Sequence, residues 1–500
     1  MAGLHAVWGR LPRALLKVAS GVLIALSVAA LGGCGSSSPS SSSSPLATAL
    51  SYLPANSPLV IKVATNPHSS SVSSLQSLLS SIPAVRLGEA AVVAKLEQEG
   101  ISYDSDIRPL LGNPLVFGAS TQSVSRATGR QFIFAWVVKN PSTLRTLLSK
   151  GGRRQIGSHD GAALYPFGNG EMAVKGATVV ASGDTATVTS ALNRHAAGGG
   201  VTAGSYARAT TGLPTSALVD VFGNLAQVLS SPRDARARRV PWVAAIKGYA
   251  VSLSAASGSM ALSYRLDTSG GTLTSAQLPL SPGAGAPKLT AGMPIEVGID
   301  DPAHSFFFLE SVEQATGARN YGAFLGRQAA LRKKTGVDLN TLAHQLSGDL
   351  DVESNTSTTI GRAAVSNPTA SKHVLAKLAS APPKLLFTNA TAIKRVSGGL
   401  YSISRRGKAP FTVGVIGNQL VAGKATAAQL RAFATAPSTP APGAKGALAF
   451  RIALPDLIHL ALHRSPSQAE ALVLSVLGEL TGYSGDSPSA LNGNAALQVK

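Results

Sequence analysis

The stretch PLVIKV at residues 58–63 decides the fold of this chain, because a related stretch, PIEVGI, occurs at residues 294–299. Each is a short run with apolar and β-branched residues that begins at a proline, which is typical of a strand bounded by a turn. The first stretch lies near the start of the chain, and the second lies just beyond its middle. The pair therefore predicts a strand in each half of the chain, within a unit that occurs twice.

Further matches follow this pair in the same order along both halves. Each match alone carries no weight, since such dipeptides are common, but their shared order and nearly constant spacing do. The spacing is far longer than the repeat of a solenoid, so it indicates two similar domains in tandem. The matches are Gly100-Ile101 with Gly336-Val337, Gly112 with Gly348, Asn140-Pro141 with Asn367-Pro368, Leu164-Tyr165 with Leu400-Tyr401, Ala217-Leu218 with Ala447-Leu448, and Gly248-Tyr249 with Gly482-Tyr483.

The predicted fold class is α+β, with each domain built from a mainly antiparallel sheet and helices packed on one side of it. We assign residues 46–269 to the first domain and 289–500 to the second, joined by a linker at 270–288 that is rich in Ser, Gly and Pro. Hydrophobic periodicity predicts the elements. The expected strands are 58–63, 115–119, 132–138, 162–167, 172–181 and 217–222, with a hairpin at 249–266; the expected helices are 72–82, 184–192, a segment from Pro141, 303–334 and 471–480.

The segment 1–33 has the order of an export signal. Arg10, Arg13 and Lys17 precede an apolar run at 18–31, which is shorter than the roughly 20 residues that span a bilayer. The segment ends at Gly33, and Cys34 after it is the only cysteine. This ending resembles the lipobox of bacterial lipoproteins, which implies cleavage after Gly33 and a lipid on Cys34. The alternative is an uncleaved signal anchor. Residues 34–45 are mostly Ser and predict a flexible tether.

The chain is strongly basic, with a net charge of +20, of which +17 remains when Arg10, Arg13 and Lys17 are removed with the signal. Such a field favours anionic lipid headgroups or wall polymers as partners. The absence of aromatic residues among the basic clusters argues against nucleic acid. Alternatively, the clusters are ordinary solvated loops and helix ends. They are Arg153-Arg154, 233–239, 327–334 and 405–408.

Several short motifs together resemble a known family. They are Leu53-Pro54 before the first strand, Leu110-Leu111-Gly112 before the next, Val138-Lys139-Asn140-Pro141 before a helix, and the strand with Leu164-Tyr165. In this order they are similar to an actinobacterial family of exported and lipid-anchored proteins, catalogued only as a domain of unknown function. The resemblance covers residues 46–500, as two tandem copies. It implies a location in the cell envelope and brings no catalytic residues.

Catalytic motifs are missing from the sequence. There is no Gly-x-Ser-x-Gly elbow, no Ser-x-x-Lys pair and no phosphate-binding Walker loop. The best metal candidates are Asp456, His459 and His463, which share one face of an expected helix. Without a further strong ligand they are interpreted as structural residues, so no metal or cofactor is expected. Asp349 and Asp351 likewise lack the additional oxygen ligands of a calcium site.

The sequence alone does not establish an activity. We expect a lipid-anchored envelope protein at the outer face of the cytoplasmic membrane, with a non-enzymatic binding or structural role and an unknown protein partner. One alternative is a carrier of lipid or a small hydrophobic ligand, with a pocket between sheet and helices. A second is an envelope hydrolase with a site assembled from distant residues. A deep apolar cavity would favour the carrier, and a flat basic face the first hypothesis.

The anchor generates a direct prediction. Intact-mass analysis of the native protein should find Cys34 as the first residue and joined to lipid, because a lone exported thiol has no partner for a disulfide. A bare thiol at Cys34, or a chain found free in the cytosol, would contradict it.

Overall fold

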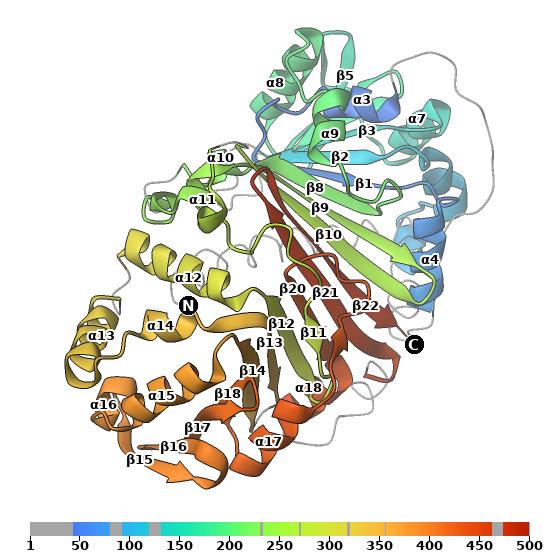
Figure 1. Ribbon diagram of the computed structural model, residues 1–500. Coiled ribbons are helices and arrows are strands. Elements are labelled where there is room, and N and C mark those ends of the chain that lie inside the picture. The colour runs from blue at the N-terminus through green and yellow to red at the C-terminus, as the bar shows by residue number, and fades with distance from the viewer. Residues whose placement is uncertain are drawn as a thin grey trace.

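The computed structural model describes residues 44–80, 93–119, 132–230, 234–269, 272–317, 321–355, 357–462 and 474–499. The expected signal and nearly all of the expected tether therefore lie outside the described residues. Within them the protein is a mixture of helices and strands dominated by one large antiparallel sheet. Figure 1 shows the sheet running the length of the molecule, with helices near both ends.

Ten strands of the first half enter this sheet. They pair in the order β4-β5-β6-β7-β3-β2-β1-β8-β9-β10, and every neighbouring pair is antiparallel. Their bounds are β1 (Leu59–Val63), β2 (Leu115–Ala119), β3 (Phe132–Val137), β4 (Gly157–His159), β5 (Ala162–Phe167), β6 (Gly170–Lys175), β7 (Thr178–Ser182), β8 (Val219–Asn224), β9 (Ile246–Ala256) and β10 (Ser259–Thr268).

The strands of the second half repeat this order as β15-β16-β17-β18-β14-β13-β12-β20-β21-β22, again antiparallel throughout. Two further strands, β11 (Lys288–Leu289) and β19 (Thr439–Pro440), form a small separate ladder. The bounds are β12 (Ile295–Asp300), β13 (Leu346–Ser354), β14 (Thr359–Val365), β15 (Ala390–Val396), β16 (Leu400–Arg405), β17 (Lys408–Ile416), β18 (Gln419–Lys424), β20 (Leu448–Ala453), β21 (Leu477–Ser487) and β22 (Ala490–Val499).

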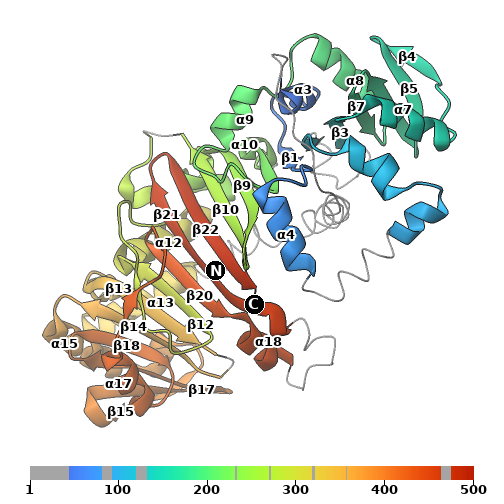
Figure 2. The ribbon, with the colours of Figure 1, turned by 90° about the vertical axis from the view of Figure 1, so that its right-hand side faces the viewer.

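The two series join through β10 and β22, so the halves share one continuous sheet. The pairing is antiparallel, and Ser263 lies opposite Asn494. These two residues occupy the same position in their hairpins, and the Asn494 side-chain amide donates to the Ser263 hydroxyl at 2.9 Å. The halves are thus related by an approximate two-fold rotation at this point, in the manner of an isologous interface. Figure 2 shows β9, β10, β21 and β22 between the two ends of the molecule.

Most predicted elements of the first half are present. Asn140 and Asn367 each cap a helix that begins at the following proline, where the ring fits the first turn. Asp184 caps α8 through the Thr187 N–H. Helix bounds in the first half are α3 (Pro45–Leu50), α4 (Ser70–Ser80), α7 (Pro141–Lys150), α8 (Thr185–Ala196), α9 (Ala203–Ala209), α10 (Leu225–Val228) and α11 (Pro241–Ala245); a further helical stretch covers 93–98.

In the second half, helices gather around the end of the sheet formed by β15 to β18. Across both halves, short 3-10 or π turns lie at Tyr103–Ile107, Arg108–Leu110, Ala237–Arg239, Ser275–Gln277 and Ser397–Gly399. The helix bounds are α12 (Pro302–Thr316), α13 (Tyr321–Thr335), α14 (Leu339–Ala343), α15 (Pro368–Ala379), α16 (Pro383–Leu386), α17 (Ala427–Thr435) and α18 (Leu454–Leu462).

Three predicted elements were wrong. The expected strand 172–181 is two strands, because Gly176 turns the chain with a φ of 62°. The expected helix 303–334 is two helices, since Gly317 ends α12 in the left-handed region. The expected helix 471–480 falls partly outside the described residues; 474–476 are helical, but Leu477 and Leu480 belong to β21. Their apolar side chains match a strand in the middle of a sheet as well as they match a buried helix.

The prediction of helices on one side of the sheet was also wrong. On β3, Ile133 and Ala135 pack with α3 and α8, whereas Phe134 and Trp136 pack with α7. Because apolar residues occupy both faces of the sheet, helices must cover both faces. We call the face that carries Ile133 and Ala135 the α8 face, and the face that carries Phe134 and Trp136 the α7 face. In the second half α17 covers the α8 face and α15 covers the α7 face.

The registers also correct one sequence match. Ile246 and Leu477 begin the equivalent strands β9 and β21, and counting from them places Tyr249 level with Leu480. Gly248-Tyr249 and Gly482-Tyr483 are therefore three positions out of register. The counterpart of Ser252 is Tyr483, since Ser252 lies opposite Asp220 and Tyr483 opposite the equivalent Ala449. A shared dipeptide does not report which residues lie opposite each other.

The segment between the halves packs against the molecule. Leu278 is fully buried and joins a small cluster with Ala245 and Leu273.

Of the helices in the described ranges, none has the length and apolar character to cross a bilayer.

A buried ion pair holds the α8 face of the first half together. Lys62 Nζ lies 2.9 Å from Asp220 Oδ2, and that oxygen also accepts from the Tyr206 hydroxyl at 2.7 Å. Ser252 donates to the other carboxylate oxygen. The counterparts of Lys62 and Asp220 in the second half are Gly298 and Ala449, which also lie opposite each other. The fold therefore accepts uncharged residues at these two positions.

Removing one partner of this pair should cost far more than neutralising both. Lys62→Met should lower the free energy of unfolding by about 3–5 kcal/mol, because it leaves a buried carboxylate without its cation. Lys62→Met combined with Asp220→Asn should lose less, since the amide still bonds Tyr206 and Ser252. Urea unfolding measures these two variants and Asp220→Asn alone. A double variant whose loss of stability equals the sum of the two single losses would contradict the ion-pair account.

Candidate functional site

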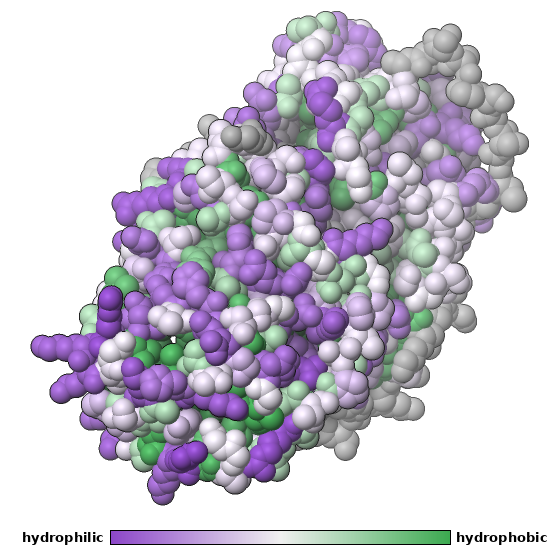
Figure 3. Space-filling view, viewed as in Figure 1, coloured by the Kyte–Doolittle hydropathy of each residue, from purple (hydrophilic) through white to green (hydrophobic). Residues whose placement is uncertain are grey.

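An apolar cavity of about 290 Å³ lies in the second half, on the α7 face. Its floor is formed by β15, β16 and β17, and its walls by α13, α14, α15 and α16. Figure 3 shows hydrophobic atoms in a hollow at the lower left, over the region where Figure 1 places these helices. The floor residues are Ile393, Tyr401, Ile403, Phe411 and Val413, and the wall residues include Leu331, Leu339, Leu342, Leu375, Leu378, Leu385 and Leu386.

The cavity has a packed counterpart in the first half. The strand registers pair Tyr401 with Val413 and, at the equivalent place, Tyr165 with Met172. Tyr165 and Met172 pack with Leu144, Leu147 and Leu148 of α7 in a filled cluster. In the second half the cluster spreads over four helices, and α14 and α16 contain only five and four residues. Such short helices offer few side chains to fill the space above the sheet.

Two arginines lie beside the cavity. Arg327 of α13 lines it directly. The Arg405 guanidinium stacks over two lining rings, 5.5 Å from the Phe387 centroid and 5.7 Å from that of Phe411, and donates to the Ala409 carbonyl oxygen at 2.9 Å. No carboxylate among the described residues forms an ion pair with either arginine. The cavity therefore combines an apolar interior with positive charge beside it.

The size and lining of the cavity limit what it can hold. Ligand pockets in proteins usually measure about 300–1,000 Å³ and are mostly apolar with a few polar groups. At about 290 Å³ the cavity is at the lower end of that range. It exceeds the roughly 150 Å³ that suffices for benzene in an engineered apolar cavity. A single alkyl chain or a small hydrophobic molecule fits this volume and chemistry.

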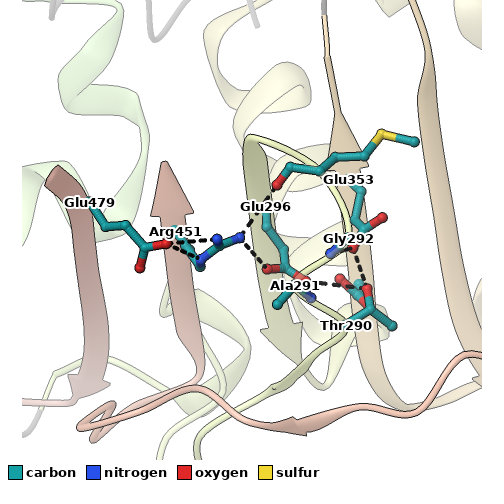
Figure 4. A network of polar contacts seen from close by, with 9 residues as sticks. Thr290, Ala291, Gly292, Glu296, Glu353, Arg451 and Glu479 are labelled. Carbon is teal, nitrogen blue, oxygen red and sulfur yellow. Dashed lines mark hydrogen bonds and ion pairs between the residues drawn. The ribbon is translucent and has the colours of Figure 1, made fainter. Parts of the chain in front are cut away.

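A network of buried charges occupies the other face of the same half. Glu296 of β12 lies opposite Glu353 of β13, and Asp351 of β13 lies opposite Arg362 of β14. Glu296 is fully buried, and Asp351 and Glu353 nearly so. Figure 4 shows the loop from Thr290 to Gly292 facing Glu296 and Glu353, and Arg451 reaching toward Glu296 and Glu479.

Three carboxylates converge on a single hydroxyl. Thr290 Oγ1 lies 2.9 Å from Asp351 Oδ2, 3.2 Å from Glu296 Oε1 and 2.5 Å from Glu353 Oε1. One hydroxyl proton satisfies only one of these oxygens, so the others depend on further donors nearby. Burial raises the pKa of Asp351 to about 7 and also raises the pKa of Glu296.

The network fastens two segments to the sheet. The N–H groups of Ala291 and Gly292 donate to Glu296 and Glu353, both at 2.6 Å, and hold Ala291 in the left-handed region with a φ of 58°. Arg362 donates to the carbonyl oxygens of Phe433 and Ala436 at the end of α17, both at 2.7 Å. Because the acids are enclosed and lie on the opposite face from the cavity, we interpret the network as structural.

A serine and a histidine also meet, 144 positions apart in the sequence. Ser51 Oγ lies 2.6 Å from His195 Nδ1, and Tyr52 stacks on the His195 ring at 4.2 Å. The Ser51 hydroxyl donates to the Thr48 carbonyl oxygen, also at 2.6 Å, which makes His195 the donor to Ser51. A histidine that donates to the serine is not placed to remove its proton. No sequence signal could have found this pair, because neither residue lies in a motif.

Only some of the site residues predicted from the sequence lie within the described residues. Gly33, Cys34 and His463 lie outside the described residues. Asp456 is exposed in the first turn of α18, which also contains His459. In the part of the chain that the structure describes, no three His, Cys, Asp or Glu residues are arranged to hold a metal. Asp351 belongs to the buried network, and the cavity residues were not predicted, since they come from seven separate elements.

Comparisons with known proteins add little. No family model matches the chain, and no curated protein matches it. Among solved structures, crystal form III of TP0453 matches at 11% identity and a TM-score of 0.28, covering 47% of this chain and 84% of that one. Crystal form I of TP0453 matches at 11% identity and a TM-score of 0.26, covering 47% and 82%. At these TM-scores the likeness carries no argument, and the family resemblance stays a prediction.

The buried network generates a prediction about pH. Because folding raises the pKa of Asp351 from 3.8 to about 7, its stabilising contribution is complete below pH 3.8 and is lost as the pH rises toward 7. The loss should approach about 1.4 kcal/mol per pH unit at its steepest. Asp351→Asn should remove this slope, as judged by urea unfolding from pH 4 to 8 (about the range of the shift).

The matched control for this measurement is Asp104→Asn. Its carboxylate is mostly exposed and pairs only with Arg108 on the same helical turn. This variant should keep the slope of the wild-type protein. An Asp351→Asn protein with an unchanged slope would show that Asp351 releases no proton over this range.

Proposed function

We propose that this protein is a lipid-anchored envelope protein that binds a hydrophobic molecule in the cavity between β15–β17 and α13–α16. The observation that carries the proposal is the cavity itself, with a volume of about 290 Å³ and an almost entirely apolar lining. Of the three functions expected from the sequence, a carrier of lipid or a small hydrophobic ligand needs such a space. The other two, a surface-binding protein and a hydrolase, do not.

The chemistry around the cavity narrows the ligand class. An alkyl chain would replace water against leucine and phenylalanine side chains, and each buried methylene contributes about 0.8 kcal/mol. Arg327 and Arg405 provide positive charge beside the cavity without a competing carboxylate among the described residues. A single-chain amphiphile with an anionic headgroup suits both features.

The anchor is the second part of the proposal. The basic start, the short apolar run and Cys34 support export and attachment of lipid at Cys34, which would hold the protein at the outer face of the cytoplasmic membrane. Stable anchoring requires two acyl chains or an equivalent second signal. The role is non-enzymatic, and hydrophobic molecules in that membrane are the available ligands.

The third part of the proposal concerns the origin of the two halves. We propose that residues 46–269 and 289–500 are two copies of one α+β unit. The repeated strand order and the equivalent helix starts at Pro141 and Pro368 support this. The cavity is then a property of the second copy, since the corresponding residues of the first are packed together.

Filling the cavity should abolish ligand binding without unfolding the protein. Val413→Trp places a large ring above the sheet, where Val413 lines the cavity. Binding of a fluorescent fatty acid should weaken about tenfold or more, which corresponds to roughly 1.4 kcal/mol. Lipid extraction and mass spectrometry of the native protein should also recover a bound apolar molecule that the variant lacks.

The matched control is Met172→Phe, at the equivalent strand position of the first half, where the side chain is packed in a filled cluster. It should bind the probe as the wild-type protein does. Equal loss of binding in both variants, or a wild-type protein that neither binds the probe nor carries lipid, would exclude the cavity as a ligand site.

A further inference from the structure

The positive charge of this protein is concentrated in one part of the chain. Residues 355–455 contain no Asp or Glu, and they include the floor of the cavity and the two walls formed by α15 and α16. The same stretch contributes 13 of the 44 basic residues, and therefore +13 of the net charge of +20. They are Arg362, Lys372, Lys377, Lys384, Lys394, Arg395, Arg405, Arg406, Lys408, Lys424, Arg431, Lys445 and Arg451.

Five of these side chains are lysines exposed on elements that line the cavity. Lys384 is exposed on α16, whose next two residues line the cavity. Lys372 and Lys377 are exposed on α15, which also contributes side chains to the cavity, and Lys394 and Lys408 are exposed on two strands of the floor. None of these five lysines has an ion-pair partner among the described residues. We call this surface, together with the end of α13, the basic end.

Apolar side chains accompany the charges. Leu325 of α13 is 42% exposed and follows Phe324, which lines the cavity. The last turn of α13 adds exposed Arg332, Lys333 and Lys334. A soluble anionic polymer would need only the charges, whereas a lipid surface accepts cations at its headgroups and leucines just below them.

We propose that the basic end docks on an anionic lipid bilayer, with the cavity facing the membrane. Each Lys or Arg near such a surface contributes about 1 kcal/mol, and the attraction fades within a Debye length. Several unpaired cations together therefore hold the surface against the bilayer, and salt releases it. This goes beyond ligand binding, because it depends on the exposed charges and not on the cavity.

The experiment uses the full chain, reconstituted into vesicles through its own N-terminal segment. Leu325→Cys is labelled with an environment-sensitive fluorophore, and the vesicles contain lipid-borne quenchers. Ile156→Cys, an exposed apolar position of the first half, provides the control label. The Leu325 label should be quenched in vesicles containing phosphatidylglycerol, unquenched in pure phosphatidylcholine and released by salt. The Ile156 label should stay unquenched throughout.

Charge reversal identifies the docking residues. Lys372→Glu, Lys377→Glu and Lys384→Glu together should reduce quenching to the level of pure phosphatidylcholine. The matched control reverses three exposed arginines of the first half, Arg145, Arg153 and Arg154, with the same change in net charge. It should dock normally. The proposal would be overturned if both triple variants lost quenching equally, or if the wild-type label were quenched as much in neutral vesicles as in vesicles containing phosphatidylglycerol.

Two further arms separate the alternatives. Val413→Trp should dock normally, so that failure of ligand binding and failure of docking are distinguished. A purified anionic wall polymer, added to the labelled protein in neutral vesicles, should leave the Leu325 label unchanged. A response to the polymer without a response to phosphatidylglycerol would assign the basic end to the wall and overturn docking on lipid.

Discussion

The pairing of β10 with β22 is the contact on which the architecture depends. It joins two series of ten strands into one sheet, with Ser263 opposite Asn494 at the centre. Without it, each half would end in a long strand with unpaired N–H and C=O groups, which invites association with other chains. With it, the outermost strands of the described sheet are β4, which has three residues, and β15, which has seven. The approximate two-fold symmetry follows from the antiparallel pairing of equivalent strands.

The same backbone buries different chemistry in its two halves. On the α8 face, the first half has Val60, Val116 and Ala135 in an apolar core, and the counterparts in the second half are Glu296, Asp351 and Arg362. These charges are tolerated because Thr290, two backbone N–H groups and Arg451 satisfy most of them. The first half instead places one ion pair, Lys62 with Asp220, where the second has Gly298 and Ala449. Equivalent positions therefore differ in composition while the strand pairing stays the same.

On the α7 face, the two halves differ in how completely their side chains fill the space between sheet and helices. Its first half is filled, whereas its second half encloses a cavity beneath four helices. The cavity and the acid-free basic stretch share α15, α16 and β15 to β17, at the end of the sheet formed by β15 to β18. An apolar space surrounded by unpaired cations is suited to the boundary between water and anionic lipid, where a molecule anchored by its N-terminus would work. The second half thus combines the features that our two proposals require.

Local interactions were predictable from the sequence, because they depend on residues that are neighbours in the chain. The helix starts at Pro141 and Pro368, the cap at Asp184, the strand at 162–167 and the hairpin turn at Ser257-Gly258 are of this kind. The common order of the matched dipeptides also indicated that the two halves resemble each other. The concentration of basic residues in 355–455 could equally be counted from the sequence, although its position around a cavity could not.

Tertiary structure alone decided the rest. The cavity is a space left between seven elements, and no pattern in one segment specifies a space that others leave unfilled. The network around Thr290 joins residues 61 and 63 positions apart through strand register. The three-residue error at Gly482-Tyr483 has the same origin, since dipeptide identity does not determine which residues lie opposite each other. Sequence by itself determined the short-range elements and the repeated order; packing between distant segments determined the faces, the buried charges and the cavity.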